Sequence, residues 1–279
     1  MSDSREKSAL ALGITQVSVL RVRADGARPS MDEVAVEAPL EIRVAGEVLA
    51  TTMRTPGSDI ELVAGLLLSE GLVRSREQLG RIEARDGVVE VHGVAGERAL
   101  SVGLTASRRG TLTSSACGVC GRLGIDDLLD GLTPADPSVR FDARVLGRLP
   151  AALAAAQPNF ARTGGLHAAA IALGDGSLLV VREDVGRHNA VDKAVGRLLL
   201  DGRLPLAEGV LVVSGRASFE IVQKAATAGL SALVSVSAPS SLAIETAERV
   251  GALLIGFARA GGFNVYAGRA RLSGEFAAV

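Results

Sequence analysis

Features that would place this chain in several common functional classes are scarce or missing. Its 279 residues include 30 lysines and arginines against 31 aspartates and glutamates, a net charge of -1. No overall field therefore draws the protein to nucleic acid or to anionic lipid. No apolar run reaches the ~18 residues of a membrane-spanning helix, and the opening residues, MSDSREK, lack the apolar core of a signal peptide. We expect a cytoplasmic protein without nucleic-acid or membrane partners.

Cysteine is equally scarce, because the chain contains only Cys117 and Cys120. One pair with two residues between its members excludes a scaffold of disulfides and indicates metal or redox chemistry. The glycine after each cysteine leaves the backbone free to bend. Neighbouring arginines favour the thiolate, which is the reactive form; they are Arg108, Arg109 and Arg122. The segment 114–122 is therefore predicted to be a sulfur-handling loop.

Three other interpretations of the pair stay open. Both thiols could be buried packing residues, although glycine-rich neighbours without apolar periodicity disfavour burial. A structural disulfide would close too small a loop to stabilise so long a chain. A zinc ion needs further ligands, which His92, His167 and His188 or the cysteines of a second subunit could supply. Reactive sulfur chemistry is favoured over all three, and we expect no resident metal.

The first half of the chain has the pattern of a β-rich domain with few helices. Residues 1–13 show no period and are expected to form a flexible tail. Strands are predicted over 14–22, 33–36, 40–54 with a turn at 45–46, 81–84, 88–92 and 98–104. A capping-box pattern at 58–61 and Gly71 delimit one helix, and a second box at 75–78 predicts a shorter one. We assign residues 14–140 to this mixed-sheet domain, which carries the Cys-x-x-Cys loop.

The second half alternates between strand and helix patterns. Asp142 opens a helical stretch that is expected to be interrupted at Pro150. The patterns that follow predict strands over 167–173, 178–182, 209–213, 232–236 and 253–257 and helices over 189–200, 218–228 and 240–250. This order predicts an α/β/α domain over 141–279, with a partly parallel sheet, helices on both faces and ligands at the loops beyond the strand ends.

Two polar loops follow predicted strands. The loop 214–218, SGRAS, opens a helix, so its backbone N–H groups and Arg216 could hold a phosphate. It lacks the Gly-Lys-Ser/Thr of a P-loop, and a bare turn with a capping serine would have the same sequence. The loop 183–189, EDVGRHN, has the density of titratable groups typical of a site, although a solvated helix start is a fair alternative. Glycine-bearing loops at 163–167 and 256–262 are weaker signals.

His167 begins an otherwise apolar run, where a histidine is more often a hydrogen-bonded core residue than a ligand. Zinc deaminases share the alternating α/β order, but their site needs His-x-Glu followed by Pro-Cys-x-x-Cys. Ala169 occupies the glutamate position here, and no cysteine follows. The proton-transfer group is missing, so hydrolytic deamination is disfavoured.

Five motifs occur in an order that matches a known family. They are SACGVCG at 115–121, TGGLHAA at 163–169, EDVGRHNAVDK at 183–193, SGRAS at 214–218 and SAPSS at 237–241. Together they resemble the formate dehydrogenase accessory sulfurtransferase family, FdhD, over nearly the whole chain after the tail. The resemblance implies a carrier of persulfide sulfur from a cysteine desulfurase to the molybdenum cofactor, before that cofactor enters formate dehydrogenase.

The resemblance also implies roles for individual residues. Cys117 would hold the persulfide, and Cys120 would assist or accept it. The cofactor, molybdenum bis(molybdopterin guanine dinucleotide), would be bound as a substrate. The C-terminal domain would resemble the cytidine deaminase-like fold without its chemistry, and the protein would be a homodimer. Cofactor binding would fall to His167, Arg187, His188, Ser214, Arg216, Phe257, Ala258, Arg259, Ala260, Gly261 and Gly262, the last at a position where relatives can carry a basic residue.

Two rival functions belong to other classes. Cys-x-x-Cys is also the spacing of dithiol oxidoreductases, whose motif opens a helix early in a small domain; here only a short helical segment, 124–129, follows. A non-catalytic cofactor chaperone that holds zinc on its cysteines is the second rival. Stoichiometric zinc or disulfide turnover would distinguish these from a sulfur carrier.

Overall fold

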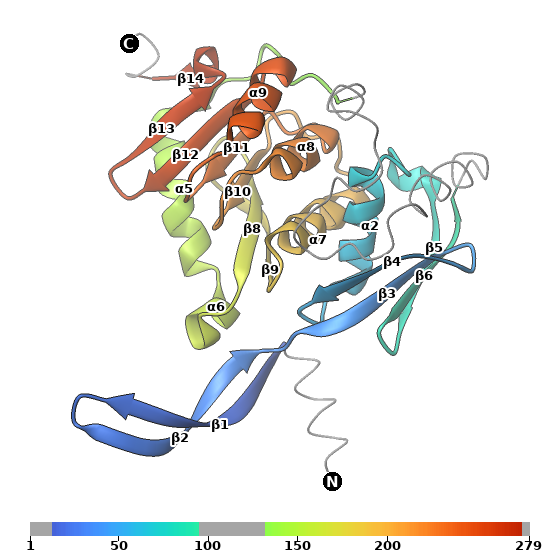
Figure 1. The fold of residues 1–279 in the computed structure, drawn as a ribbon. Helices are drawn as coiled ribbons and strands as arrows, with labels where there is room; N and C mark the ends of the chain where they lie inside the picture. Colours follow the sequence, from blue (N-terminus) through green and yellow to red (C-terminus); the bar gives the residue numbers. More distant parts are fainter. Residues whose placement is uncertain (1–12, 95–131, 275–279) are drawn as a thin grey trace.

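The computed structural model describes residues 13–94 and 132–274, and the predicted strand 98–104 and the cysteine loop lie outside them. The described chain forms a mixed α/β structure whose main body is built in layers (Figure 1). A four-stranded sheet is followed by a layer of helices, a six-stranded sheet and a further helix on its other face. Within the described ranges, no helix is both long and apolar enough to span a bilayer.

A two-stranded hairpin projects from the body at the N-terminal end (Figure 1). It consists of β1 (Ile14–Arg23) and β2 (Gly26–Ala35), paired antiparallel. One face of the hairpin carries Leu20, Val22 and Met31, which are 65%, 70% and 57% exposed. No third described strand covers this face, so the hairpin presents apolar surface to the solvent.

The four-stranded sheet has the order β4-β3-β6-β5. Its strands are β3 (Ala38–Val44), β4 (Glu47–Arg54), β5 (Leu79–Arg85) and β6 (Val88–Val94). β3 pairs parallel with β6 and antiparallel with β4, and β5 pairs antiparallel with β6. The predicted mixed sheet and its turn at 45–46 are confirmed, and a second turn at 86–87 joins β5 to β6.

Helix α2 (Asp59–Ser69) is the predicted helix, but the capping box that predicted it does not form. Ser58 has a left-handed backbone and makes no side-chain cap bond. Glu61 turns instead to Arg182, which donates from Nη2 to Oε1 at 2.8 Å. Gly71 ends the helix in the expected left-handed conformation, φ 71°. The second box yields only a 3₁₀ turn, η1 (Arg76–Gln78).

The six-stranded sheet has the order β13-β12-β11-β10-β8-β9. Its strands are β8 (His167–Ala172), β9 (Leu178–Asp184), β10 (Val210–Val213), β11 (Ala232–Ser235), β12 (Leu253–Arg259) and β13 (Gly262–Ala267). The three strands β10, β11 and β12 are parallel, and the others run against their neighbours. The predicted partly parallel sheet is confirmed, and β13 is an edge strand that the sequence patterns did not reveal.

Helices cover both faces of this sheet. One face packs against α7 (Arg187–Leu200), α8 (Phe219–Thr227) and α9 (Ser241–Val250), and the other against α5 (Ala143–Ala155). The short elements are α6 (Pro158–Thr163), η2 (Arg269–Arg271) and the paired β7 (Phe141–Asp142) and β14 (Leu272–Ser273). The apolar core on the α7 side continues through α2 to β3 and β6, so both halves of the chain share it.

The expected interruption at Pro150 is wrong, because α5 continues through it. Proline removes one helical hydrogen bond, yet Pro150 is buried along with Leu146, Leu149 and Leu153. This apolar face packs on the sheet, and tertiary packing of such a face supplies most helix stability in proteins. Asp142 caps the helix as predicted, accepting from the backbone N–H of Arg144 at 2.7 Å.

Candidate functional site

The parallel strands β10, β11 and β12 all end at one edge of the six-stranded sheet. Because β8 runs antiparallel to β10, its first residue, His167, lies at the same edge. His167 is also paired with Asp184, the last residue of β9. The loops after three strands and the start of α7 therefore meet here, at the strand ends where ligands of such sheets bind.

Two predicted residues, His167 and Arg187, converge around Gly215 in the loop after β10. A Cβ at Gly215 would lie 3.5 Å from Nδ1 of His167 and 3.7 Å from Cδ of Arg187, so glycine keeps this space open. The Nε of Arg187 is buried and has no hydrogen-bond partner among the described residues. A buried guanidinium donor without a partner is costly, and an anion placed in this space would satisfy it. The geometry thus suits a phosphate or another anionic group.

Burial and neighbouring positive charge set the protonation of the site. Burial lowers the pKa of His167 below its ordinary value, with Arg187 and His188 acting in the same direction and Asp184 opposing them. Nε2 of His188 lies 3.7 Å from a carboxylate oxygen of Glu220. This histidine, assisted by the Ser218 hydroxyl, lowers the pKa of Glu220 to about 2. Around neutral pH the edge therefore holds a neutral His167 beside a cationic Arg187.

His167 makes the stability of the protein depend on pH in a defined direction. The pKa of His167 is lower in the folded than in the unfolded chain. As the pH falls through about 6.5, the unfolded chain therefore binds more protons than the folded chain does, which favours unfolding. We expect the free energy of unfolding to fall between about pH 7.5 and about pH 5.5, and to fall less in His167→Gln. Urea titrations of both proteins at the two pH values check this; an equal fall in both would contradict it.

A buried ion pair fixes the segment that carries Arg187 and His188. Asp184 is fully buried and lies 2.7 Å from Nζ of Lys193. Its carboxylate also accepts from the backbone N–H of Gly186 at 2.8 Å and of Thr55 at 3.1 Å. Lys193 in turn donates to the Thr55 carbonyl at 2.8 Å. The start of α7 is thus tied to the chain that follows β4.

Serine hydroxyls hold the loops of the edge in place. Ser214 accepts from the backbone N–H of Ala168 at 2.9 Å, so this predicted cofactor residue already has a structural partner. Ser235 is fully buried and donates to the Gly215 carbonyl at 2.7 Å. Neither Ser235 nor Glu220 was singled out from sequence. The only sequence signal for Ser235 is its place as a polar residue at the end of an apolar strand.

Phe257 stands out within the predicted segment 257–262. It has a positive φ of 51° and a side chain that is 44% exposed. Bulky residues rarely adopt this conformation, which costs on the order of 1–3 kcal/mol and tends to occur at functional sites. Its N–H donates to the Ser237 carbonyl at 3.1 Å, so Phe257 lies at the same edge as the loop after β11.

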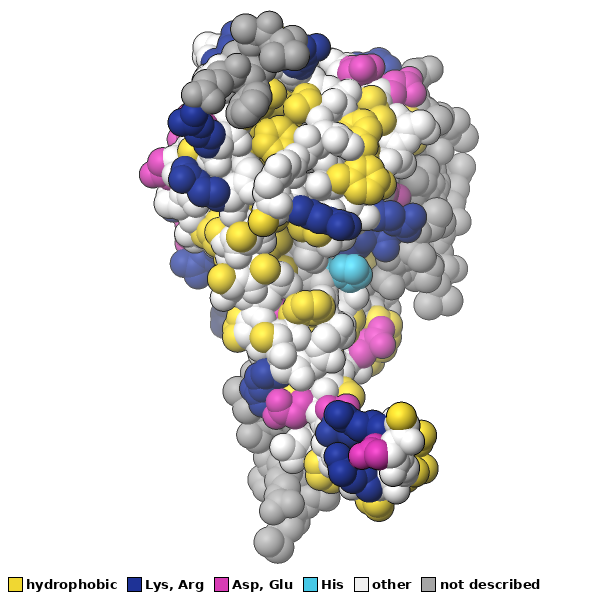
Figure 2. Space-filling model, turned by 90° about the vertical axis from the view of Figure 1, so that its left-hand side faces the viewer, with side chains coloured by type: hydrophobic (Ala, Val, Ile, Leu, Met, Phe, Trp, Pro, Cys, Tyr) yellow, Lys and Arg dark blue, Asp and Glu magenta, His cyan; other side chains and the backbone are white. Residues whose placement is uncertain are grey.

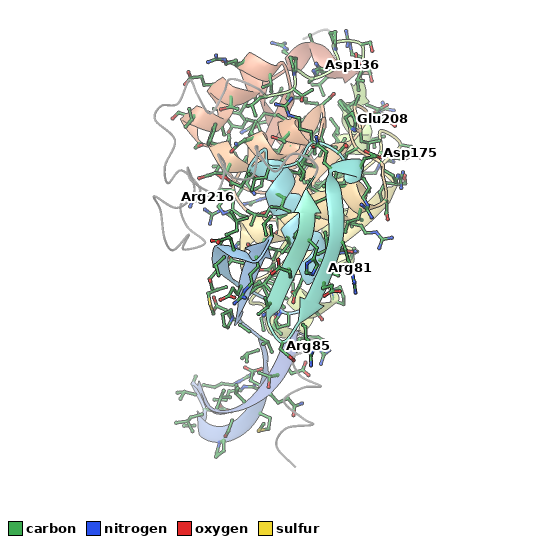
Figure 3. All side chains as sticks on the ribbon, turned by 90° about the vertical axis from the view of Figure 1, so that its right-hand side faces the viewer. Arg81, Arg85, Asp136, Asp175, Glu208 and Arg216 are labelled. Carbon is green, nitrogen blue, oxygen red and sulfur yellow. The ribbon has the colours of Figure 1, made fainter. Side chains whose placement is uncertain are left out.

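The remaining predicted residues lie on the loop after β10 and around the turn between β12 and β13. Arg216 is exposed on the loop after β10, and Figure 3 labels it at the surface. Arg259 and Gly262 close the tight turn between β12 and β13, with Ala260 and Gly261 at its tip, and Ala258 is buried. Figure 2 shows a histidine among basic and hydrophobic side chains at the centre of the face that carries β13, with acidic ones nearer the margins.

Cys117 and Cys120 lie outside the described residues, so their predicted roles stay predictions. In the described part of the chain, no three histidine, aspartate or glutamate side chains are grouped to hold a metal ion. His92 faces Glu83 at 3.5 Å on the four-stranded sheet, whereas His167 and His188 lie at the edge of the other sheet. The three histidines suggested as zinc ligands therefore do not come together.

Comparison with known proteins accords with this architecture. The chain is 49% identical over 249 residues to the sulfur carrier protein FdhD of Corynebacterium efficiens, covering 85% of this chain and 90% of the relative. It is 46% identical over 274 residues to the same protein of Streptomyces avermitilis, covering 94% and 96%.

A solved structure matches as well. It is the crystal structure of a candidate formate dehydrogenase accessory protein from Desulfotalea psychrophila, with a TM-score of 0.75 and 25% identity, covering 93% of this chain and 99% of that one. The model of the FdhD/NarQ family matches residues 35–273, nearly the whole chain. The chain therefore belongs to the FdhD/NarQ family.

Proposed function

We propose that this protein is a sulfur carrier that takes persulfide sulfur from a cysteine desulfurase and passes it to the molybdenum cofactor before that cofactor enters formate dehydrogenase. The relatives that share nearly half of its residues are sulfur carrier proteins, and the similar solved structure is that of a candidate formate dehydrogenase accessory protein. The observation in the fold that carries the proposal is the open, cationic space around Arg187 and Gly215.

The proposed chemistry begins at Cys117. Its thiolate, favoured by the neighbouring arginines, attacks the outer sulfur of the donor's persulfide. The donor's sulfur–sulfur bond breaks, the donor cysteine leaves as a thiolate, and a new sulfur–sulfur bond forms on Cys117. The reduced metal of the cofactor then takes the outer sulfur and supplies the two electrons that make it a sulfide ligand, while Cys117 leaves as a thiolate. Cys120 assists this transfer or accepts the sulfur in between.

The described residues suit the acceptor in this scheme. The cofactor, as the bis(guanine dinucleotide) form, carries several phosphates, and guanidinium groups bind phosphate well. Arg187 offers an Nε without a partner among the described residues, beside a neutral histidine. Helices on both faces of a partly parallel sheet support the proposed relation to the cytidine deaminase-like fold. The exposed apolar side chains of the β1–β2 hairpin, Leu20, Val22 and Met31, support a homodimer.

The proposal predicts that sulfur loading depends on one of the two thiols. After incubation with a cysteine desulfurase and cysteine, wild-type protein should gain the mass of one reducible sulfur atom, and Cys117→Ala should gain none. Cys117→Ala should also abolish maturation of formate dehydrogenase, because in this scheme only Cys117 receives sulfur from the donor. Intact-protein mass spectrometry and a formate dehydrogenase assay measure the two effects.

Cys120→Ala is the matched control, since it removes a thiol from the same loop and leaves Cys117 to accept sulfur. It should still be loaded. Circular dichroism of both variants confirms that the fold is kept. Full formate dehydrogenase activity with Cys117→Ala would refute the mechanism. Stoichiometric zinc or a stable internal disulfide in place of sulfur loading would favour the chaperone or the oxidoreductase.

A further inference from the structure

The exposed phenylalanine side chains of the described chain lie at one edge of the molecule. Phe141 and Phe219 are buried and Phe263 is half-buried, whereas Phe160 and Phe257 are 43% and 44% exposed. These last two both lie at the edge of the six-stranded sheet that holds the candidate site. Interfaces between proteins are enriched in aromatic side chains, so their position indicates a contact surface beside the site.

The two rings flank the row of strand ends that forms this edge. The backbone N–H of Phe160 donates to a carboxylate oxygen of Glu183 at 2.7 Å, which places α6 beside the end of β9. Phe257 lies near the end of β12, where its N–H donates to the carbonyl of Ser237 in the loop after β11. In the sheet order β12-β11-β10-β8-β9, spacings of about 4.8 Å place the two positions roughly 20 Å apart. A standard interface of about 800 Å² per partner is roughly 30 Å across and covers both.

The exposed ring of Phe257 occurs together with a strained backbone. Its φ of 51° is unfavourable for a bulky residue, whereas glycine or asparagine adopts this conformation more readily. A ring that is 44% exposed gains little from packing inside the described chain. Burial of the ring by a partner would offset the strain, because burying an aromatic side chain is strongly favourable.

A strip of exposed backbone leads from Phe160 to the site. Helix α6 is capped by Gly164, and both Gly164 and Gly165 are exposed. His167, the half-buried first residue of β8, follows two residues later. The Glu183 carboxylate accepts from two backbone N–H groups of α6, so the helix is fixed against β9 and the ring is held in one place.

Exposed arginines accompany the two rings at this edge. Arg216 lies on the loop after β10 and Arg259 at the end of β12. Neither forms a side-chain hydrogen bond or ion pair with any residue in 13–94 or 132–274. Arginine is enriched in protein interfaces as phenylalanine is, whereas lysine and the acidic residues are depleted. Figure 2 shows basic and hydrophobic side chains together at the centre of this face. A complementary surface would present apolar pockets and carboxylates.

We propose that this edge, from Phe160 on α6 to Phe257 on β12, is the docking surface for the enzyme that receives the cofactor. Both rings enter apolar pockets of that enzyme, and Arg216 and Arg259 face its carboxylates. The inference rests on the proposed function, in which a cofactor held at this edge passes to formate dehydrogenase. A cofactor that moves directly between two proteins leaves through the surface around its site, and the two rings enclose that surface. The proposed homodimer uses the β1–β2 hairpin instead, which leaves this edge free.

The test measures binding of the full chain to purified formate dehydrogenase that lacks its cofactor, by biolayer interferometry. Neither protein carries cofactor, so the affinity reports contacts between the two proteins alone. Phe160→Ala changes a residue with no assigned role in cofactor binding. It should raise the dissociation constant by about tenfold or more, as the loss of an aromatic interface anchor does. Phe160→Leu should recover part of the affinity.

Phe257→Asn tests the strained position by two readouts that move in opposite directions. It should weaken binding to cofactor-free formate dehydrogenase by a similar factor, because the ring is lost. It should also keep or raise the thermal midpoint, because asparagine tolerates the left-handed backbone. A ring that served only the packing of this chain would give the reverse, a lower midpoint with unchanged binding.

Val48→Ala is the matched control, because Val48 is 50% exposed at the start of β4, the opposite end from the Thr55 contact with Asp184. It should bind formate dehydrogenase as wild type does. The proposal is overturned if wild type does not bind, or if both phenylalanine variants bind unchanged. It is also overturned if Phe160→Ala dissociates a homodimer in sedimentation velocity, or weakens binding of the cysteine desulfurase instead.

Sulfur loading of Cys117 in wild type is measured separately, by intact-protein mass spectrometry. Loading without binding to formate dehydrogenase would reject the docking surface alone. Binding without loading would reject the sulfur-carrier function alone.

Discussion

Asp184→Ala is expected to lower the free energy of unfolding by about 3–5 kcal/mol, the cost of leaving one member of a buried ion pair unpaired. The ammonium group of Lys193 is 2% exposed and would lose its only carboxylate partner in the described chain. Two backbone N–H groups, of Thr55 and Gly186, would lose their acceptor as well. Lys193→Met should cost less, because the Asp184 carboxylate would keep these donors and the Asn189 amide. Urea denaturation of both variants measures the difference.

The surface pair Arg85–Asp86 provides the control. Its side chains are 91% and 87% exposed and lie 3.3 Å apart, and exposed pairs contribute about 0–1 kcal/mol. Arg85→Ala should therefore leave the unfolding curve nearly unchanged. If Asp184→Ala left the free energy of unfolding as little changed as Arg85→Ala does, the buried pair would not stabilise the fold. The contacts between Thr55 and the start of α7 would then contribute nothing to stability. A larger loss in Lys193→Met than in Asp184→Ala would contradict the role given to the backbone donors.

Segments with a regular pattern of apolar residues correctly predicted strands and helices of the fold. Short apolar runs at 209–213 and 232–236 became the fully buried strands β10 and β11, since only a sheet covered on both faces buries every residue of a strand. The order of strands and helices then placed the following loops at one edge. His167, Arg187 and Ser214, which the family resemblance grouped as cofactor residues, lie at this edge, and their role in binding stays a prediction.

Predictions from local sequence patterns failed at positions where tertiary contacts contribute more to stability than the local preference does. Pro150 breaks an isolated helix, but a buried apolar face keeps α5 continuous through it. Glu61 fits a capping box, but Arg182 on β9 provides a stronger partner. The strand β13 mixes glycine, polar and aromatic residues and was missed. Within the described chain, the Nε of Arg187 is buried without a partner because of how separate elements pack, and no spacing along the sequence encodes this.

Gly65→Ala and Gly196→Ala should each destabilise the protein by about 3 kcal/mol or more, the upper part of the range for overpacked cores. The helices α2 and α7 cross at these two glycines. A Cβ at Gly65 would overlap the carbonyl oxygen of Asp192, and one at Gly196 would overlap that of Glu61. Backbone atoms cannot rotate away as a side chain can, so the helices must separate. The gain of about 1 kcal/mol from replacing a helical glycine by alanine is too small to offset this.

Gly147→Ala on α5 is the matched control, because this glycine is also helical but its added Cβ would make an ordinary 3.7 Å contact with Phe263. It should keep or raise the thermal midpoint, whereas the two crossing variants should lower it. The double variant Gly65→Ala/Gly196→Ala should cost less than the sum of the single changes, because one separation of the helices relieves both overlaps. Strict additivity would mean that the two glycines act independently. A stability gain in Gly65→Ala would show that α2 and α7 do not pack backbone to backbone, and the placement of Arg187 at the start of α7 would then need another explanation.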